Sequence, residues 1–175
     1  MVVLKGRGFI LRSARLSDSE CLFLAEQDRE ARRNFMTTPK SVNEVKRDMR
    51  SYLREANKSS PAKGVFVVEV DGVCAGSVWW RKDRDFFVAN HKVSIGYVLH
   101  KEFRGKGIGS KAIRLLSDYL FRKYRFKRIS ATTRTFNIGS RKALEKAGFK
   151  LEGILRKNKC KNGKYLDDCV YAMIR

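Results

Sequence analysis

Long apolar runs are missing from this sequence of 175 residues, which excludes a common class of membrane protein. No stretch approaches the roughly 20 consecutive apolar residues of a membrane-spanning helix. The first eight residues, MVVLKGRG, are too short and too polar for a secretory signal peptide. We therefore expect a cytoplasmic protein without a membrane partner.

Proline and cysteine are also scarce. With two prolines and 43% hydrophobic residues, the composition is that of a globular chain and not of a disordered one. The cysteines lack any C-x-x-C spacing, so we expect neither a zinc site nor a disulfide framework, and no metal. We interpret all four as small buried or half-buried thiols, with a core position favoured for the last: Cys21, Cys74, Cys160 and Cys169.

Acidic residues are few, 18 against 39 lysines and arginines, which gives a net charge of +21. One small anionic ligand does not account for so large an excess. The charge indicates work beside nucleic acid, as on a ribosome, or a source with a basic proteome or a salt-rich cytosol. The length fits a single domain over residues 1–175 with one substantial core.

The chain is organised around a strand that leads through a turn into a helix. Lys92 to Leu99 alternates apolar and polar residues and then becomes apolar, which is typical of a strand buried on one face and then on both. Apolar residues recur at helical spacing from Ile108 to Tyr119, so a helix should begin near Gly107.

The turn between them holds three glycines at alternate positions, Gly105, Gly107 and Gly109. Such a turn exposes successive backbone N–H groups at the positive end of a helix dipole, which predicts an anion-binding site. A mononucleotide P-loop is rejected, because Ser110 and Lys111 follow the last glycine in reverse order. The dinucleotide fingerprint G-x-G-x-x-G does not fit the run G-K-G-I-G either.

The spacing R-x-x-G-x-G, carried by Arg104, Gly107 and Gly109, resembles the acetyl-CoA pyrophosphate loop of the GNAT superfamily of N-acetyltransferases. Residues 137–153 resemble the second signature of that family, in which Asn137 opens a helix and Ser140 follows three residues later. A solvated glycine turn and ordinary helix caps would explain each stretch separately. They do not explain why both occur in the order of the family.

The resemblance covers essentially the whole chain and implies an α/β (α+β) GNAT fold. We expect a single mixed, mostly antiparallel sheet of six to seven strands, with a splayed parallel pair at residues 92–99 and 128–133, flanked by about four helices. Residues 30–40 are expected to form a loop in which Phe35 and Met36 touch the substrate. Other strands are predicted at 9–12, 65–70, 73–80, 149–155 and 165–174, and other helices at about 17–29, 42–56 and 137–147. We expect a type I′ turn at Asp71 and Gly72 and a basic turn over residues 156–164 centred on Asn162 and Gly163. Ser41 is expected to cap the helix at 42–56.

The cofactor implied by the resemblance is acetyl-CoA. In the family, the pantetheine arm pairs with the central strand, whose N–H groups near Val98 and Leu99 would polarise the thioester carbonyl. Arg104 and Lys106 could contact phosphates directly. The predicted cofactor-binding residues are Val98, Leu99, Arg104, Gly105, Lys106, Gly107, Ile108, Gly109, Ser110, Asn137 and Ser140.

The candidate catalytic residues are Ser140, Tyr97 and Asp85. By resemblance, Ser140 would lie near the CoA sulfur and donate to the departing thiolate. The helix position where many GNAT proteins place a tyrosine acid is Leu144, which agrees with the Rim-type ribosomal-protein acetyltransferases.

The general base is less clear from the sequence. The two positions where a carboxylate would be expected are Ser94 and Lys159. The remaining candidates are Asp85, His91, and Asp167 or Asp168, although the last two could simply pair with nearby cations.

The expected function is transfer of an acetyl group from acetyl-CoA to a protein N-terminal α-amine. An α-amine with a pKa near 8 needs little help from a base, whereas a lysine amine near 10.4 needs one. A small-molecule amine such as an amino acid, aminoglycoside or polyamine is an alternative acceptor. A basic RNA- or ribosome-binding module is an alternative of another class, suggested by the charge and by FRKYRFKR at residues 121–128, although inward packing of its aromatic residues is favoured. The protein is expected to be a monomer or homodimer.

Overall fold

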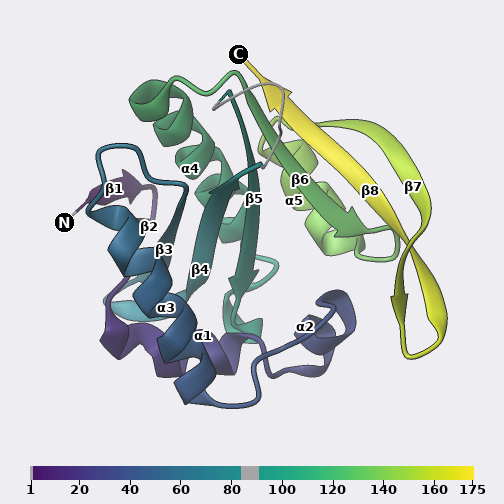
Figure 1. The fold of residues 1–175 in the computed structure, drawn as a ribbon, viewed down its shortest axis with the longest axis horizontal. Coiled ribbons are helices and arrows are strands. Elements are labelled where there is room, and N and C mark those ends of the chain that lie inside the picture. Colours follow the sequence, from purple (N-terminus) through teal and green to yellow (C-terminus); the bar gives the residue numbers. More distant parts are fainter. Residues whose placement is uncertain (1, 84–90) are drawn as a thin grey trace.

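The computed structural model describes residues 2–83 and 91–175, and its main feature is one mixed sheet. Eight strands lie in the order β1-β2-β3-β4-β5-β6-β8-β7, and all neighbours are antiparallel except β5 and β6 (Figure 1). The strands are β1 Val3–Gly6, β2 Phe9–Ser13, β3 Lys63–Val70, β4 Val73–Lys82, β5 Lys92–Leu99, β6 Arg128–Arg134, β7 Lys150–Lys161 and β8 Lys164–Ile174.

In the part of the chain that the structure describes, five α-helices accompany the sheet. They are α1 Ser19–Ala25, α2 Arg29–Asn34, α3 Val42–Ala56, α4 Ile108–Tyr124 and α5 Ile138–Lys146. Single 3₁₀ turns at Leu16–Asp18 and Lys101–Phe103 precede α1 and α4. No described helix combines the length and the apolarity that a membrane span requires.

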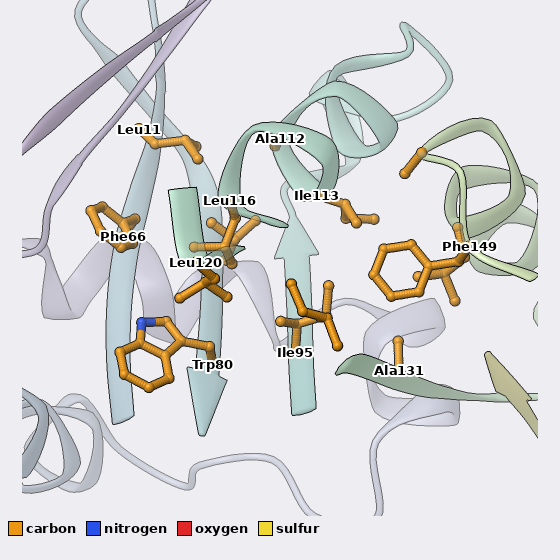
Figure 2. Packing of buried hydrophobic residues seen from close by; sticks show 14 of the residues in the cluster. Leu11, Phe66, Trp80, Ile95, Ala112, Ile113, Leu116, Leu120, Ala131 and Phe149 are labelled. Atoms are coloured by element: carbon orange, nitrogen blue, oxygen red, sulfur yellow. The ribbon is translucent and has the colours of Figure 1, made fainter. Parts of the chain in front are cut away.

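Helices cover both faces of the sheet, and each face has its own core. Along β3, Phe66 and Val68 pack in the cluster that contains α4, whereas Val67 packs with Leu22 of α1 and Met49 of α3. The alternation follows from the two-residue period of a strand. Figure 2 shows the larger cluster, in which Leu116 and Leu120 of α4 lie beside Trp80, Phe66 and Ile95 of the sheet.

Several local structures follow directly from the sequence. The loop between β3 and β4 places Asp71 and Gly72 at φ of 49° and 78°, the positive values that a type I′ turn requires, as predicted. Helix α3 begins where the cap was expected, since the Ser41 side chain accepts a hydrogen bond from the Glu44 N–H at 3.3 Å. Strand β5 and helix α3 have the predicted bounds.

The N-terminal part departs from the prediction. The sheet has an additional strand, β1, paired to β2, so that its strand count exceeds the expected six to seven. The helix expected at 17–29 is shorter, since it begins at Ser19, after a 3₁₀ turn whose Asp18 forms an ion pair with Arg12 of β2, and ends at Ala25. Residues 30–34, expected in a loop, belong to α2. Asp28 caps this helix, since its side chain accepts from the N–H groups of Glu30 and Ala31.

The C-terminal hairpin is longer than predicted. Strand β7 does not end near Leu155 but continues with a bulge to Lys161, and β8 begins at Lys164. The connecting residues Asn162 and Gly163 have φ of 51° and 74°, so the turn itself lies where the sequence indicated. The basic segment expected to be a turn is thus mostly strand.

The cysteines do not all remain free thiols, which corrects the prediction. Cys21 of α1 and Cys74 of β4 form a disulfide across 53 residues of sequence. Their pairing depends on the packing of α1 against β4, which no short sequence spacing reveals. Cys160 is exposed, contrary to expectation, while Cys169 is buried in the core as predicted.

Candidate active site

The two parallel strands separate shortly after they meet. Strands β5 and β6 pair at three positions, of which Ser94 with Ser130 is the last, and then diverge (Figure 1). Beyond Ser94, the edge of β5 that faces β6 has no described strand partner. A cleft of about 790 Å³ opens there, lined by Ser94 to Leu99 on one side and Ala131 to Arg134 on the other. This arrangement confirms the predicted splayed pair.

The glycine turn lies at the end of β5 and lines the cleft. Gly105 and Gly107 have φ of 75° and 74°, and a Cβ at either would meet nothing within 4 Å. Glycine is required there by backbone conformation and not by close packing. Helix α4 starts at Ile108, so its first N–H groups, which have no intrahelical partner, lie beside the cleft residues Gly109 and Ser110.

Arg104 lines the same cleft, but its guanidinium is engaged with protein carboxylates. It forms an ion pair with Asp28 and another with Glu30, at 3.0 Å, while its Nε donates to the Leu99 carbonyl at 2.9 Å. The guanidinium holds the pKa of the Asp28 carboxyl below its usual range, against the opposing effect of burial. Arg104 therefore joins the glycine turn to the start of α2.

Asn137 and Ser140 stand at the start of α5, where the sequence placed them. The Asn137 Oδ1 accepts a hydrogen bond from the Ser140 N–H at 3.1 Å, which caps the helix. Both residues line the cleft. Leu144, one turn further along α5, is buried in the larger core.

Tyr97 faces these residues from β5. Its ring lies 3.3 Å from the position that a Cβ on Gly109 would occupy, and the Ser140 side chain is near enough to act on the pKa of its phenol. Burial raises the pKa of Tyr97, although Ser140 opposes the shift. At neutral pH the phenol is therefore protonated and can act as a donor. Two side chains with hydroxyl groups, Tyr97 and Ser140, thus line the cleft near one another.

On the face of the sheet opposite to that of Tyr97, three aromatic side chains line the cleft and form an aromatic wall: Phe35, Tyr52 and Trp79. Of these, the sequence indicated Phe35 alone. In the register of β4 and β5, Trp79 lies opposite Gly96, and a side chain at Gly96 would clash with the indole at 2.5 Å. The Phe35 ring lies 6.3 Å from that of Trp79, and Tyr52 of α3 also lines the cleft. Phe35 and Met36 line it as well, but whether they contact a substrate stays a prediction.

Two acids line the cleft among the described residues, Glu30 and Asp168, and both are paired. Asp168, 1% exposed, forms an ion pair with Arg134 and accepts from the Asn158 side chain at 2.8 Å. Asp167 accepts from the Lys157 N–H at 2.7 Å and does not line the cleft.

The remaining base candidates are not in the described cleft. His91 does not line it, and Asp85 lies outside the described residues. Ser94, which stands where a carboxylate would be expected, donates its hydroxyl hydrogen to the Arg81 carbonyl at 3.4 Å. Within residues 2–83 and 91–175, no group of three or more His, Cys, Asp or Glu side chains is placed to hold a metal.

The structure thus brings together most of the residues selected from sequence. The cleft is lined by Tyr97, Val98, Leu99, Arg104, Gly105, Gly107, Gly109, Ser110, Asn137 and Ser140, whereas Lys106 and Ile108 do not line it. The aromatic wall was missed because Tyr52 and Trp79 carry no motif. Only the register of β4 on β5 and the packing of α3 place them here.

The basic segment at residues 121–128 lies apart from the cleft. Phe121 and Phe126 are buried, and the Tyr124 ring lies 5.2 Å from that of Trp80. The aromatic side chains therefore pack inward, as was favoured, and do not form a stacking surface for bases.

Comparisons with known proteins agree with this geometry. Residues 9–150 match the family model described as the acetyltransferase (GNAT) domain. The probable N-acetyltransferase YjcK of Bacillus subtilis is 48% identical over 80 residues, 46% of this chain and 44% of YjcK. The match thus spans less than half of YjcK. The uncharacterized N-acetyltransferase p20 of Bacillus licheniformis is 28% identical over 167 residues, 94% of this chain and 92% of p20.

Solved structures share the fold over nearly the whole chain. A RimL ribosomal-protein α-N-acetyltransferase in complex with coenzyme A superimposes with a TM-score of 0.85 at 21% identity, covering 99% of this chain and 98% of that one. At this level of identity the likeness shows a common fold.

Proposed function

The chain belongs to the GNAT family of acetyl-CoA-dependent acetyltransferases, and from that premise we propose that it acetylates the N-terminal α-amine of a cytoplasmic protein. The Rim-type structural neighbours support this acceptor class, since one is named for α-N acetylation of a ribosomal protein. A curated relative, 36% identical over 86 residues, is named as a putative ribosomal N-acetyltransferase.

The absence of an unpaired carboxylate in the described part of the cleft carries the proposal. Glu30 is held by Arg104, and Asp168 by Arg134 and Asn158. If either carboxylate accepted a proton, its ion pair with the arginine would be lost, so neither is suited to act as a base. A lysine side-chain amine, with a pKa near 10.4, is almost entirely protonated at pH 7 and requires a strong base. An α-amine, with a pKa near 8, supplies about a tenth of its molecules in the reactive neutral form.

The cleft fits acetyl-CoA by its chemistry. The glycine turn offers backbone N–H groups and the start of α4 for a diphosphate, and Lys142 and Lys146 of α5 add positive charge to the lining. Acetyl-CoA supplies the thioester whose acetyl group is transferred. In this proposal the backbone N–H groups of Gly105, Lys106, Gly107, Ile108, Gly109 and Ser110 hold its diphosphate. Arg104 orders the turn through its ion pairs with Asp28 and Glu30.

The hydroxyl pair and the free edge of β5 would perform the chemistry. The unpaired edge of β5 offers the Leu99 N–H to an incoming chain or to the carbonyl oxygen that becomes negative, whereas the register of β4 and β5 turns the Val98 N–H toward β4. Ser140, oriented by Asn137 and adjacent to Tyr97, donates a hydrogen bond to the leaving sulfur. The thioester C–S bond breaks as the amine nitrogen bonds to the carbonyl carbon, and the amine proton passes to solvent.

Competing peptide substrates test the acceptor. One peptide has a free N-terminus and no lysine, and its partner is acetylated at the N-terminus and carries one lysine. We expect CoA release, followed by thiol detection, with the first peptide. Faster release with the blocked lysine peptide would refute the α-amine as acceptor.

A further inference from the structure

The cations that line the cleft suggest which N-termini the enzyme selects. Resting on the proposed function, we propose that the preferred acceptor carries acidic residues directly after its N-terminal residue, and that Arg81 and Lys159 recognise them. Both cations line the cleft and are exposed. Neither has an ion-pair partner among residues 2–83 and 91–175.

Arg81 lies on the aromatic wall, away from the glycine turn. It stands opposite Ser94 in the register of β4 and β5, two residues along the strand from Trp79, so the two side chains share one face of the sheet. Its charge acts on Tyr52 of α3, which lines the same wall. The residues assigned to the diphosphate lie on the turn and on α5. Arg81 is therefore available to an acceptor.

Lys159 comes to the same wall from the β7–β8 hairpin. Two residues further on, the Lys161 ammonium donates to the backbone carbonyls of Arg32 and Phe35 and so attaches the hairpin to the end of α2. Phe35 in turn lies beside Trp79. These contacts run from Lys161 through Phe35 to Trp79. Lys159 and Arg81 each lie two residues along their strands from the two ends of this series, and both line the cleft. The hairpin tip and α2 lie near one another at the lower right of Figure 1.

The balance of charge in the cleft favours an anionic acceptor. Six cations line it, Arg81, Arg104, Arg134, Lys142, Lys146 and Lys159, against the two paired acids. Glu26 and Asp48 act electrostatically on Tyr52, but neither lines the cleft. A basic acceptor would be repelled in this field, and an acidic segment would be attracted. The charge of Lys159 would also disfavour the protonated form of an acceptor amine nearby and so favour its neutral, reactive form.

Three matched peptides test the proposal. They begin Ala-Asp-Asp, Ala-Asn-Asn and Ala-Lys-Lys, continue identically, and are compared by kcat/KM from CoA release. An exposed ion pair is worth about a two- to fivefold change, so we expect roughly fivefold preference for the acidic over the neutral peptide. The preference should fall as salt rises from low to moderate concentration.

Variants then locate the recognition. Arg81→Gln and Lys159→Gln should each remove about half of the acidic preference in logarithmic terms, and Lys159→Glu should reverse it. Lys164→Gln removes the same charge from the same hairpin at an exposed residue outside the cleft, and should leave the ratio unchanged. Because the ratio of two peptides is read within each variant, partial misfolding does not alter it.

The outcomes separate this proposal from the proposed function. Equal rates with the acidic and neutral peptides, or an equal effect of Lys164→Gln and Lys159→Gln, would overturn the acidic preference alone. No turnover of any of the three peptides would overturn the α-amine acceptor and the preference with it.

Discussion

Replacement of Gly107 by aspartate should abolish binding of CoA while leaving the protein folded. Gly107 has φ of 74° and open space around its Cα, so an aspartate side chain fits sterically. It would place a carboxylate at the start of α4, where we assign the diphosphate. Gly8, in the turn between β1 and β2, provides a matched control: its φ is 82°, nothing lies within 4 Å, and it does not line the cleft.

The two substitutions should cost similar stability. A residue other than glycine whose backbone adopts the left-handed conformation lowers the free energy of unfolding by roughly 1–2 kcal/mol relative to glycine. For a domain of this size, 1 kcal/mol lowers Tm by about 2–4 °C, so Gly8→Asp and Gly107→Asp should each lower the apo Tm by about 2–8 °C.

The effects on ligand binding should differ sharply. Two unit charges about 4 Å apart at an effective dielectric constant near 20 repel by about 4 kcal/mol, a factor of about 1000 in Kd. Salt screening reduces this value, and we expect a loss of at least about 100-fold. Thermal-shift titration with CoA measures it. Gly8→Asp should keep the wild-type shift and Gly107→Asp should lose it. An undiminished shift in Gly107→Asp would refute the assignment of the diphosphate to this turn.

Three further predictions concern catalysis, the buried ion pair and pH. Ser140→Ala should lower kcat by roughly 100-fold with little change in the Kd of CoA, and an unchanged kcat would exclude Ser140 as a proton donor. Arg134→Leu should lower the free energy of unfolding, measured with urea, by about 3–5 kcal/mol, because it leaves the Asp168 charge buried and unpaired. Adding Asp168→Leu should recover much of that loss. A smaller loss in the single variant than in the double variant would contradict this reasoning. Burial, and then the Asp48 charge, raise the pKa of Glu26 from 4.5 to about 7, so the folded state holds a proton that the unfolded chain has released between these values. Wild-type stability relative to Glu26→Gln should therefore fall by up to about 3 kcal/mol as pH rises from 4.5 to 7 and then stay level, and a pH-independent difference would contradict the raised pKa.

The sequence predicted best those elements whose pattern and ends are both local. Helix α3 has an amphipathic period and a serine cap, and β5 has a clear change from alternating to apolar residues. Their bounds were correct for that reason. The Asp71–Gly72 turn was equally determined, because few residue pairs favour two successive positive φ values.

Elements stabilised by distant contacts were not predictable in the same way. The six residues of α2 are too few to be stable alone, and the structure supports them through Arg104, 76 residues from Asp28. The disulfide between Cys21 and Cys74 likewise depends on α1 packing against β4. Such pairings become visible only when the chain is folded.

The candidate site shows the same difference between residues with local motifs and residues that distant contacts place. The glycine turn and the Asn137–Ser140 cap carry short motifs and were located from sequence. Tyr52, Trp79 and Arg81 have no motif, and strand register alone brings two of them to the cleft. The motif did select Arg104, but only the structure shows its engagement with Asp28 and Glu30.

A crystal structure of the protein with acetyl-CoA tests the central claim most directly. We predict the diphosphate on the backbone N–H groups of residues 105–110, the pantetheine arm along the free edge of β5, and the sulfur beside Ser140. A cofactor bound elsewhere, with this turn in contact with solvent alone, would contradict the account.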